Sequence, residues 1–271
     1  NIFIPSVPVN PDGSVMYANC ALRTVEANCV KAGFRENEVI VAHPDHVDRV
    51  VGTKTKIVGV SCVDPMGIGP ASTTMSALLG GVSRTRIEFM KLMHRLMPLK
   101  NKYDFKIVVG GPGAWQIDAT NVMNDYYIDY LVLGESELSV PRLFQDITDD
   151  LDPPERLINS PTPQPHDIPS ILHPTIAGIV EISRGCGRGC RFCAPTISGR
   201  MRNMPYEKII QDVKVNVRGG HRLIHFQSED FLLYGSNNLQ PDKDAVLDLF
   251  KTVFNVKGVE GISWTHASLA S

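Results

Sequence analysis

Short runs of apolar, mostly β-branched residues alternate with amphipathic segments along the first half of the chain. The apolar runs predict strands, and the amphipathic stretches predict helices between them. The strands are expected at Ile2–Pro5, Val39–Ala42, Ile57–Ser61, Lys106–Val109 and Tyr130–Leu133, and helices at Met16–Ala32 and Thr85–Met97. Continuous apolar strands separated by helices indicate a parallel sheet that is covered on both faces. We therefore expect a doubly wound α/β domain over residues 1–150.

The alternation stops between Asp150 and Thr175, where seven prolines crowd the chain. Proline disfavours helix and donates no ladder hydrogen bond, so residues 151–175 are expected to form a semi-rigid linker. The pattern then resumes over residues 176–271. Strands are expected at Ile176–Ser183, Leu223–Phe226 and Gly261–Ala267, with helices at Tyr206–Val217 and Asp244–Val253. Three strands joined by two helices predict the first part of a β/α barrel, whose remaining strands we expect after Ser271.

Composition and charge narrow the class of protein. The 43% hydrophobic content is enough for sizeable cores, and the net charge of -2 without a basic stretch argues against a nucleic-acid platform. The sequence holds no apolar run of about 18 residues, so no membrane span is predicted. It also shows no signal peptide. Because the chain starts at Asn1 rather than Met, we expect the natural N-terminus, with any targeting segment, to lie upstream.

The six cysteines fall into two groups. Cys186, Cys190 and Cys193, the loop cysteines, lie within eight residues, whereas Cys20, Cys29 and Cys62, the buried cysteines, are scattered and are expected to act as small hydrophobes. Clustered thiols suit a metal or cluster site in a reducing compartment better than a disulfide framework, so a cytoplasmic protein is expected.

The segment from Glu181 to Cys193 carries the most specific chemical signal. Thiolates spaced by three and then two residues can ligate three irons of a [4Fe–4S] cubane and leave the fourth iron open. Flanking glycines let the backbone turn tightly, and Arg184, Arg188 and Arg191 place positive charge beside the thiolates. A structural zinc site is the alternative, but zinc prefers four ligands and only His173 offers a fourth.

This loop, with its aromatic Phe192 before the third cysteine, resembles that of the radical S-adenosylmethionine (SAM) superfamily, and the resemblance covers roughly Thr175–Ser271. It implies a full or partial β/α barrel in which the open iron binds the amino and carboxylate groups of SAM. Polar residues after the second strand then hold the SAM amino group. The SAM contacts implied in this way are Phe192, Gln227, Ser228, Glu229 and Asp230. The alternative for Glu229 and Asp230 is an ordinary exposed acidic turn.

Three turns in the first half follow predicted strands, where open α/β sheets bind ligands. They start at Ser61, Val109 and Leu133. Before a cysteine loop of this kind, these turns resemble the flavodoxin-like, B12-binding domain of cobalamin-dependent radical SAM proteins over about residues 1–150. The cobalamin contacts implied are Ser61, Asp64, Gly67, Gly69, Ser72, Thr73, Gly110, Gly111, Pro112, Gly113, Gly134 and Glu135. The alternative is that these glycines only close α/β loops.

The sequence departs from many B12 domains in one respect. None of its eight histidines lies in an Asp-x-His-x-x-Gly motif, and His43 and His46 lack both the Asp and the Gly. The lower face of cobalt is therefore unassigned, and no histidine ligand is expected from this domain.

The resemblance implies an oxygen-sensitive enzyme that uses a [4Fe–4S] cluster, SAM and cobalamin, with methyl transfer to an unactivated carbon as the commonest chemistry. Its catalytic residues, its oligomeric state and its small-molecule or peptide substrate stay unassigned. Its reductant is expected to be a flavodoxin or ferredoxin, with no nucleic-acid or membrane partner. Two alternatives stay open: a radical SAM enzyme whose first domain binds no corrinoid, and a metal-stabilised binding module that is not an enzyme.

Overall fold

A computed structural model describes residues 7–190, 193 and 199–268, and the chain divides into two compact units. Unit 2 contains Val9–Ser14 and Ala32–Thr162, and unit 1 contains Val15–Lys31 and Pro163–Ser271 together with the first eight residues. The predicted strand Ile2–Pro5 lies outside the described residues. No helix among those described is long and apolar enough to cross a membrane.

Unit 2 is built on a parallel sheet of four strands in the order β1-β2-β3-β4. The strands are β1 (Ile57–Ser61), β2 (Lys106–Gly110), β3 (Tyr130–Leu133) and β4 (Leu157–Asn159). Two short turns (η1, Glu36–Glu38; η2, Pro44–His46) and α2 (Val47–Val50) precede β1. The longer helices are α3 (Pro70–Leu79), α4 (Arg84–Lys102), α5 (Ala114–Thr120) and α6 (Val140–Thr148).

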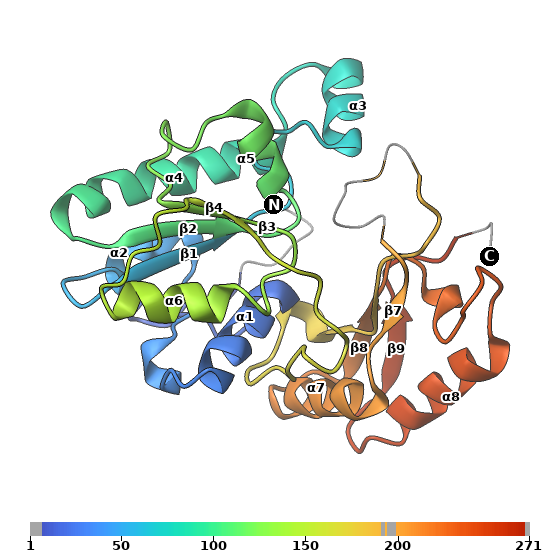
Figure 1. The fold of residues 1–271 in the computed structure, drawn as a ribbon. Helices are drawn as coiled ribbons and strands as arrows, with labels where there is room; N and C mark the ends of the chain where they lie inside the picture. Colours follow the sequence, from blue (N-terminus) through green and yellow to red (C-terminus); the bar gives the residue numbers. More distant parts are fainter. Residues whose placement is uncertain (1–6, 191–192, 194–198, 269–271) are drawn as a thin grey trace. The chain divides into compact units, whose positions relative to one another are not determined.

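Helices cover both faces of this sheet, with α4 and α5 on one face and α6 on the other (Figure 1). Val60, Ile107 and Val109 pack against Met93 and Leu96 of α4 in one core. On the opposite face, a Cβ at Gly59 would lie 3.4 Å from the ring of Phe144 in α6. Burial on both faces explains why these strands are continuously apolar, as the sequence predicted.

Three features of unit 2 differ from the predictions. Val39–Ala42 is not a strand, because only an isolated antiparallel bridge from Ala42 to Ser14 forms there. The proline-rich stretch is not merely a linker, since it contributes β4, which pairs in parallel with β3. The described strands also run in sequential order, so the reversal of strand order that defines a doubly wound sheet is not seen among them.

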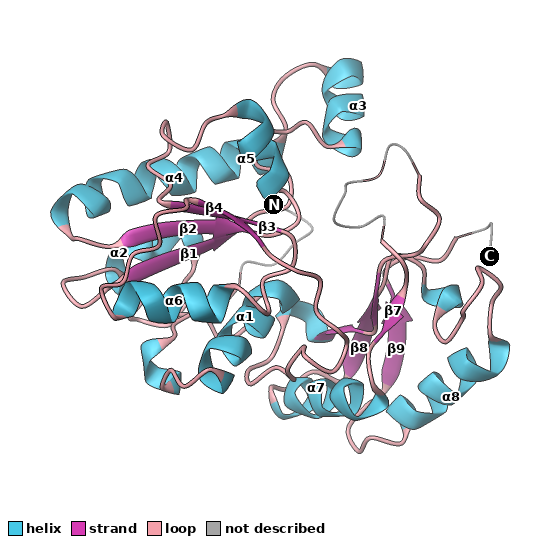
Figure 2. Cartoon of the chain, viewed as in Figure 1, coloured by secondary structure: helices cyan, strands magenta, loops and turns pink. Residues whose placement is uncertain are grey.

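Unit 1 contains a three-stranded parallel sheet in the order β5-β8-β9. These strands are β5 (Ile179–Glu181), β8 (Leu223–Gln227) and β9 (Gly261–Trp264), and β6 (Ser183–Arg184) pairs with β7 (Arg202–Asn203) in an antiparallel hairpin. The helical elements are α1 (Cys20–Lys31), α7 (Tyr206–Arg218), α8 (Lys243–Phe254) and the turns η3 (Ile176–Gly178) and η4 (Phe231–Leu233) (Figure 2). The single strand predicted at Ile176–Ser183 is thus divided into η3, β5 and the start of β6.

The core of unit 1 lies between the sheet and α7 and α8. Val180, Ile224 and Phe226 are fully buried against Ile209 and Val213 of α7. These positions repeat at strand and helix spacing, which explains why α7, α8 and β8 lie within one residue of their predicted bounds at each end.

Helix α1 belongs to unit 1, although its position in the sequence suggested the first domain. Its buried Arg23 forms an ion pair with buried Glu26 at 3.0 Å. The same guanidinium donates to the carbonyl oxygens of Val15, Met16 and Pro174. One cation therefore joins the start of the chain to the segment before β5, across 151 positions of sequence.

Candidate active site

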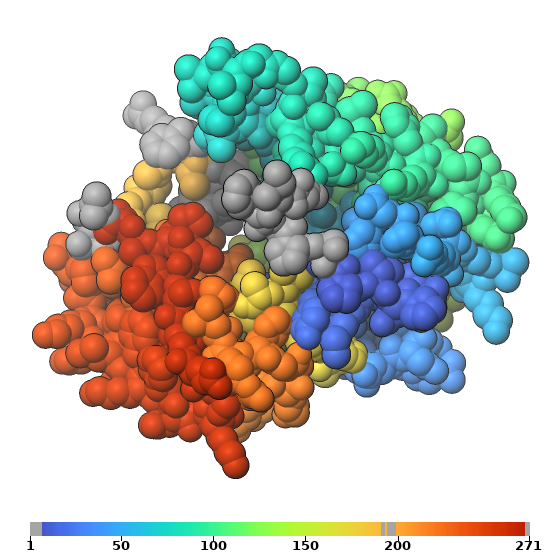
Figure 3. All heavy atoms as spheres, turned by 180° about the vertical axis from the view of Figure 1, so that it is seen from behind, coloured from blue at the N-terminus to red at the C-terminus, as the bar shows by residue number. Residues whose placement is uncertain are grey.

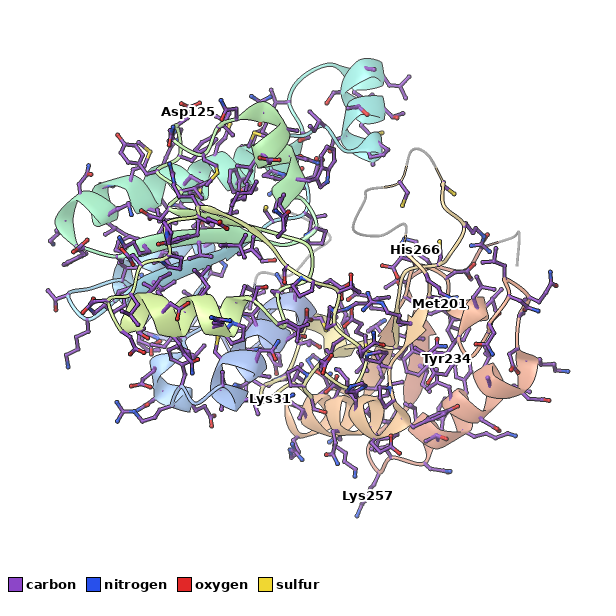
Figure 4. All side chains as sticks on the ribbon, in the orientation of Figure 1. Lys31, Asp125, Met201, Tyr234, Lys257 and His266 are labelled. Atoms are coloured by element: carbon purple, nitrogen blue, oxygen red, sulfur yellow. The ribbon has the colours of Figure 1, made fainter. Side chains whose placement is uncertain are left out.

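The carboxyl ends of β5, β8 and β9 lie side by side at one edge of the unit 1 sheet. Glu181 pairs with Gln227, and Phe226 pairs with Trp264. Figure 4 labels His266, just after β9, at this end of the sheet and Lys257, just before β9, at the opposite end. The loops that follow the three strands therefore meet at this edge, where the sequence predicted the SAM site.

Ser228 is the buried centre of a hydrogen-bond network at this edge. Its hydroxyl lies 2.7 Å from that of buried Ser183 on β6 and accepts from the backbone N–H of Asp230. Thr265 donates to the Ser228 carbonyl at 3.1 Å. Ser228 thus links the segments after all three strands, so its described contacts are structural. Gln227, by contrast, is exposed.

The loop cysteines lie between β6 and β7. All three are half-buried thiols outside any disulfide, and the backbone N–H of Cys193 donates to the carbonyl of Cys190 at 3.0 Å. The loop is narrow at its base, because a Cβ at Gly185 would lie 2.5 Å from the carbonyl oxygen of Gly199. Gly185 has a φ of +73°, so this turn requires glycine. Phe192 and Arg191 lie outside the described residues.

The donor set fits an iron–sulfur cluster in its chemistry, because three accessible thiols on one loop can each bind a different iron. The three thiols are not arranged as a metal site in this structure. Among residues 7–190, 193 and 199–268, no three His, Cys, Asp or Glu side chains lie close enough to hold one metal ion. Such a loop would close around the cluster as it binds. The zinc alternative finds no support in the described residues, since the Nδ1 atom of His173 lies 3.2 Å from the Glu26 carboxylate instead.

Two loop arginines form ion pairs with carboxylates. Arg184 binds both carboxylate oxygens of Glu181 at 2.8 and 2.9 Å. Arg188 donates to Asp230 at 2.6 Å. Their charge is therefore compensated by acidic groups at the sheet edge rather than directed at the thiols alone.

Glu229 and Asp230, the acidic pair that follows β8, have different hydrogen-bond contacts. Asp230 is fully buried and accepts hydrogen bonds from Arg188, Leu232 and Ser268. Glu229 is different, since its Oε2 atom is buried and has no hydrogen-bond partner among the described residues. Burial raises the pKa of Glu229, and the nearby Glu181 carboxylate adds to that rise. Glu229 is thus a half-buried carboxylate with one buried oxygen that has no donor among the described residues, and the exposed acidic turn considered above is wrong for both residues.

The buried cysteines have the environment expected of small hydrophobes. Cys20, Cys29 and Cys62 are each less than 9% exposed. Burial raises the pKa of each of these thiols to about 12. They are packed within the protein as small hydrophobic side chains.

In unit 2, the turn after β1 folds around Asp64. Its carboxylate accepts from the side chain of Gln116 at 2.7 Å and from the backbone N–H of Gly69 at 2.9 Å. Burial works to raise the pKa of Asp64, but hydrogen bonds from Ser72, Gln116, Gly69 and Thr85 together lower it. Asp64 is therefore held as a carboxylate that organises its own loop.

The glycines predicted to admit cobalamin are closely packed against the chain itself. A Cβ at Gly111 would lie 2.7 Å from the carbonyl of Cys62, and one at Gly113 would lie 2.3 Å from that of Val63. A Cβ at Gly134 would lie 2.7 Å from the carbonyl oxygen of Ser160. These three glycines are thus explained by the close approach of neighbouring turns. The remaining residues implied for cobalamin lie on or beside the same turns, half-buried or exposed: Ser61, Gly67, Ser72, Thr73, Gly110, Pro112 and Glu135.

Two features of these sites were not predicted from the sequence. One is the bidentate ion pair in which Glu181 holds Arg184 beside Glu229. The pattern that could have predicted this pair is a Glu at the end of a strand, three residues before an Arg. The other feature is α3, which follows the Asp64 turn and has no buried residue. Its Met75, Leu78 and Leu79 are 54–76% exposed, and the helix lies at the surface of the molecule (Figure 3). The sequence signal was the helical spacing of Met75, Leu78 and Leu79 after the Asp64 turn.

The segment around the cysteine loop is similar in sequence to known proteins. Residues 180–265 match the sequence profile of the Radical SAM superfamily. The ribosomal protein uS12 methylthiotransferase RimO of Dictyoglomus thermophilum is 35% identical over 95 residues, which are 34% of this chain and 21% of that protein. RimO of Petrotoga mobilis is 39% identical over 80 residues, which are 29% of this chain and 18% of that protein.

A solved structure extends the likeness in fold across both units. The radical SAM methyltransferase TsrM from Kitasatospora setae, with cobalamin and a [4Fe–4S] cluster bound, superposes with a TM-score of 0.62 at 13% identity. The match covers 87% of this chain and 48% of that one. At this identity the likeness concerns the fold alone. The chain spans about a fifth of the length of these curated relatives and about half of the solved one.

Proposed function

We propose that this chain, whose residues 180–265 match the Radical SAM superfamily, forms part of a cobalamin-dependent enzyme that cleaves SAM to a 5'-deoxyadenosyl radical. In the proposed reaction the radical activates a carbon that then receives a methyl group. One observation carries the SAM part of the proposal: the buried Oε2 atom of Glu229, whose carboxyl contacts Gly185 at the base of the cysteine loop, has no hydrogen-bond partner among the described residues.

The residues of unit 1 would divide the work of holding the cofactors. Cys186, Cys190 and Cys193 would ligate the cluster, which when bound supplies the electron that cleaves the sulfonium of SAM. Glu229 would accept hydrogen bonds from the cationic SAM amine, which supplies the donor that its Oε2 atom lacks. The Glu181–Arg184 pair would keep Glu229 in place through the turn at Gly185.

Unit 2 is proposed to hold the corrinoid at the turns after β1, β2 and β3. These turns lie at one edge of a parallel sheet, the edge at which open α/β folds bind ligands. The exposed apolar side chains Met75, Leu78 and Leu79 offer a surface that a large, flat ligand would cover. Because Gly111 and Gly113 are packed against the chain itself, the contacts with the ligand would come from the polar groups of the turns and from α3.

Anaerobic reconstitution of the full-length protein tests this proposal. Iron, sulfide and bound corrinoid would be quantified, and the cleavage of SAM would be followed under reducing conditions. A cluster, 5'-deoxyadenosine and a corrinoid spectrum are expected together. Replacement of both Leu78 and Leu79 by Ser should weaken corrinoid binding and leave the cluster intact. If the protein forms a cluster and cleaves SAM but binds no corrinoid, the radical SAM part stands and the cobalamin part is wrong.

The likeness to RimO favours a second candidate reaction, the transfer of a methylthio group. It shares the radical SAM domain with the first candidate but needs no corrinoid in this proposal. The mass added to a product would separate the two reactions, because a methylthio group adds sulfur and a methyl group does not.

A further inference from the structure

Arg188 occupies the middle of the cysteine loop, between the first two cysteines. Gly187 and Gly189 on either side have φ values of +75° and +61°, so the backbone turns sharply around Arg188. The backbone N–H of Gly187 bonds to Gly199 at the base of the loop. Beyond this point, the Arg188 side chain reaches back to the segment after β8.

The partner of Arg188 is a carboxylate that is held very firmly. Asp230 is 0% exposed, and its Oδ1 atom accepts from the backbone N–H groups of Leu232 at 3.3 Å and Ser268 at 3.2 Å. Its Oδ2 atom accepts from Arg188, which is 21% exposed. A buried carboxylate fixed by two backbone donors is a rigid anchor, and a cation that pairs with it loses its own freedom to move.

Glu229, the adjacent residue, lies at the same edge of the sheet but has different contacts. Its Oε2 atom is buried and has no hydrogen-bond partner in the part of the chain that the structure describes, whereas both Asp230 oxygens accept hydrogen bonds. The two carboxylates cannot therefore be equivalent, although in sequence they form one acidic pair. Asp230 pairs with the side chain of Arg188, whereas Glu229 accepts from the backbone of Gly185 and keeps one buried oxygen without a donor among the described residues.

We infer that Arg188 and Asp230 are a positioning pair, which holds the cysteine loop against the end of β8 so that the cluster assembles beside Glu229. This inference rests on the proposed function of the loop. It removes Asp230 from the groups expected to bind SAM, and it gives the loop an attachment that exists before any cluster is bound.

Arg188→Met tests the inference, because methionine keeps much of the side-chain length and removes the charge. Hydrogen exchange of the cluster-free protein should show faster exchange of the loop amides, by more than any change in the amides of α7, which report the loss of overall stability that losing the ion pair with the buried Asp230 carboxylate causes. After anaerobic reconstitution, the cluster should be lost to a chelator about tenfold faster or more, the size expected when one charge-assisted hydrogen bond is removed. Arg188→Lys should restore much of the slow rate.

Arg200→Met is the matched control, because Arg200 is an exposed arginine on the return of the same loop. It should leave both measurements unchanged, which separates the positioning of the loop from the general effect of positive charge on the thiols. Asp230→Asn should repeat the effect of Arg188→Met, and the double variant should be no worse than either single one.

The inference is overturned if, in Arg188→Met, the loop amides exchange hydrogen at the wild-type rate and the cluster is lost to the chelator at the wild-type rate. Wild-type protein that takes up no cluster would refute the proposed function instead. In that case the exchange of loop amides in the cluster-free protein would still decide whether Arg188 holds the loop.

Discussion

Replacing Glu229 by Gln should make the ligand-free protein more stable at neutral pH while it weakens the binding of SAM. The Oε2 atom of Glu229 is buried without a hydrogen-bond partner among the described residues, and burial raises the pKa of this carboxyl. Ionisation of this carboxyl is therefore less favourable in the fold than in the unfolded chain, and the amide removes that cost at nearly the same size and shape.

The sign of the pH dependence follows from the direction of the shift. An acid whose pKa is raised on folding stabilises the folded state below its ordinary pKa of about 4.5, and loses that contribution as the pH rises through the raised value. The wild-type protein loses this stability as the pH rises, but Glu229→Gln does not titrate. The two proteins should therefore be similarly stable near pH 4.5, and the variant should gain about 1–2 kcal/mol by about pH 8. For a protein of this size, that corresponds to roughly 2–8 °C in thermal midpoint.

Thermal unfolding across this pH range measures the gain, and titration calorimetry with the cluster-loaded protein measures SAM affinity. The affinity should fall about tenfold or more, because a hydrogen bond between two charged groups is lost. Glu207→Gln is the control, since Glu207 is an exposed glutamate of α7 in the same unit and should change neither quantity. If Glu229→Gln were less stable than wild type at neutral pH, or bound SAM equally well, Glu229 would not be a buried acceptor reserved for the SAM amine.

Three further predictions concern the loop cysteines, unit 1 and unit 2. Alanine at any loop cysteine should abolish most of the visible absorption of the cluster, whereas alanine at any buried cysteine should not; the opposite pattern in iron analysis would refute the assignment. Arg23→Met should cost about 3–5 kcal/mol in denaturant unfolding, because it leaves the buried Glu26 carboxylate without its guanidinium partner and removes the donor to three carbonyl oxygens. Arg35→Met, which breaks an exposed pair of the same spacing, should cost far less, and equal losses would contradict this reasoning. Gly113→Ala should lower the thermal midpoint by several degrees, since its Cβ would lie 2.3 Å from a carbonyl oxygen, whereas Gly110→Ala meets nothing closer than 3.7 Å; an unchanged Gly113→Ala midpoint would show that the turn can adjust.

The elements that could be predicted from sequence are those with a continuous or periodic apolar pattern. β1, β3 and α7 lie within a residue of their predicted bounds, because their buried positions repeat at the spacing of a strand or a helix. β4 was missed because prolines flank a strand of only three residues, whose pairing with β3 is decided by the rest of the sheet. Val39–Ala42 has the residues of a strand but forms only one bridge, since a strand also needs a partner.

In the candidate site, too, features set by neighbouring residues could be predicted, whereas features set by residues far apart in the sequence could not. The spacing of the loop cysteines is local, so the sequence could predict their chemistry. The difference between Glu229 and Asp230 was not predictable, because it depends on Arg188, which lies 42 positions from Asp230 in the sequence. The placement of α1 depends in the same way on hydrogen bonds from Arg23 to a carbonyl 151 positions away.

The most direct test of the central claim is electron paramagnetic resonance of the reduced, reconstituted protein before and after the addition of SAM. The claim is that the loop cysteines hold a cluster with an open iron, at which SAM binds beside Glu229. It predicts a [4Fe–4S] signal that changes when SAM is added, is absent from Cys190→Ala, and changes only at much higher SAM concentration in Glu229→Gln. A cluster signal that is unaffected by SAM in the wild-type protein, or one that persists in Cys190→Ala, would contradict the account.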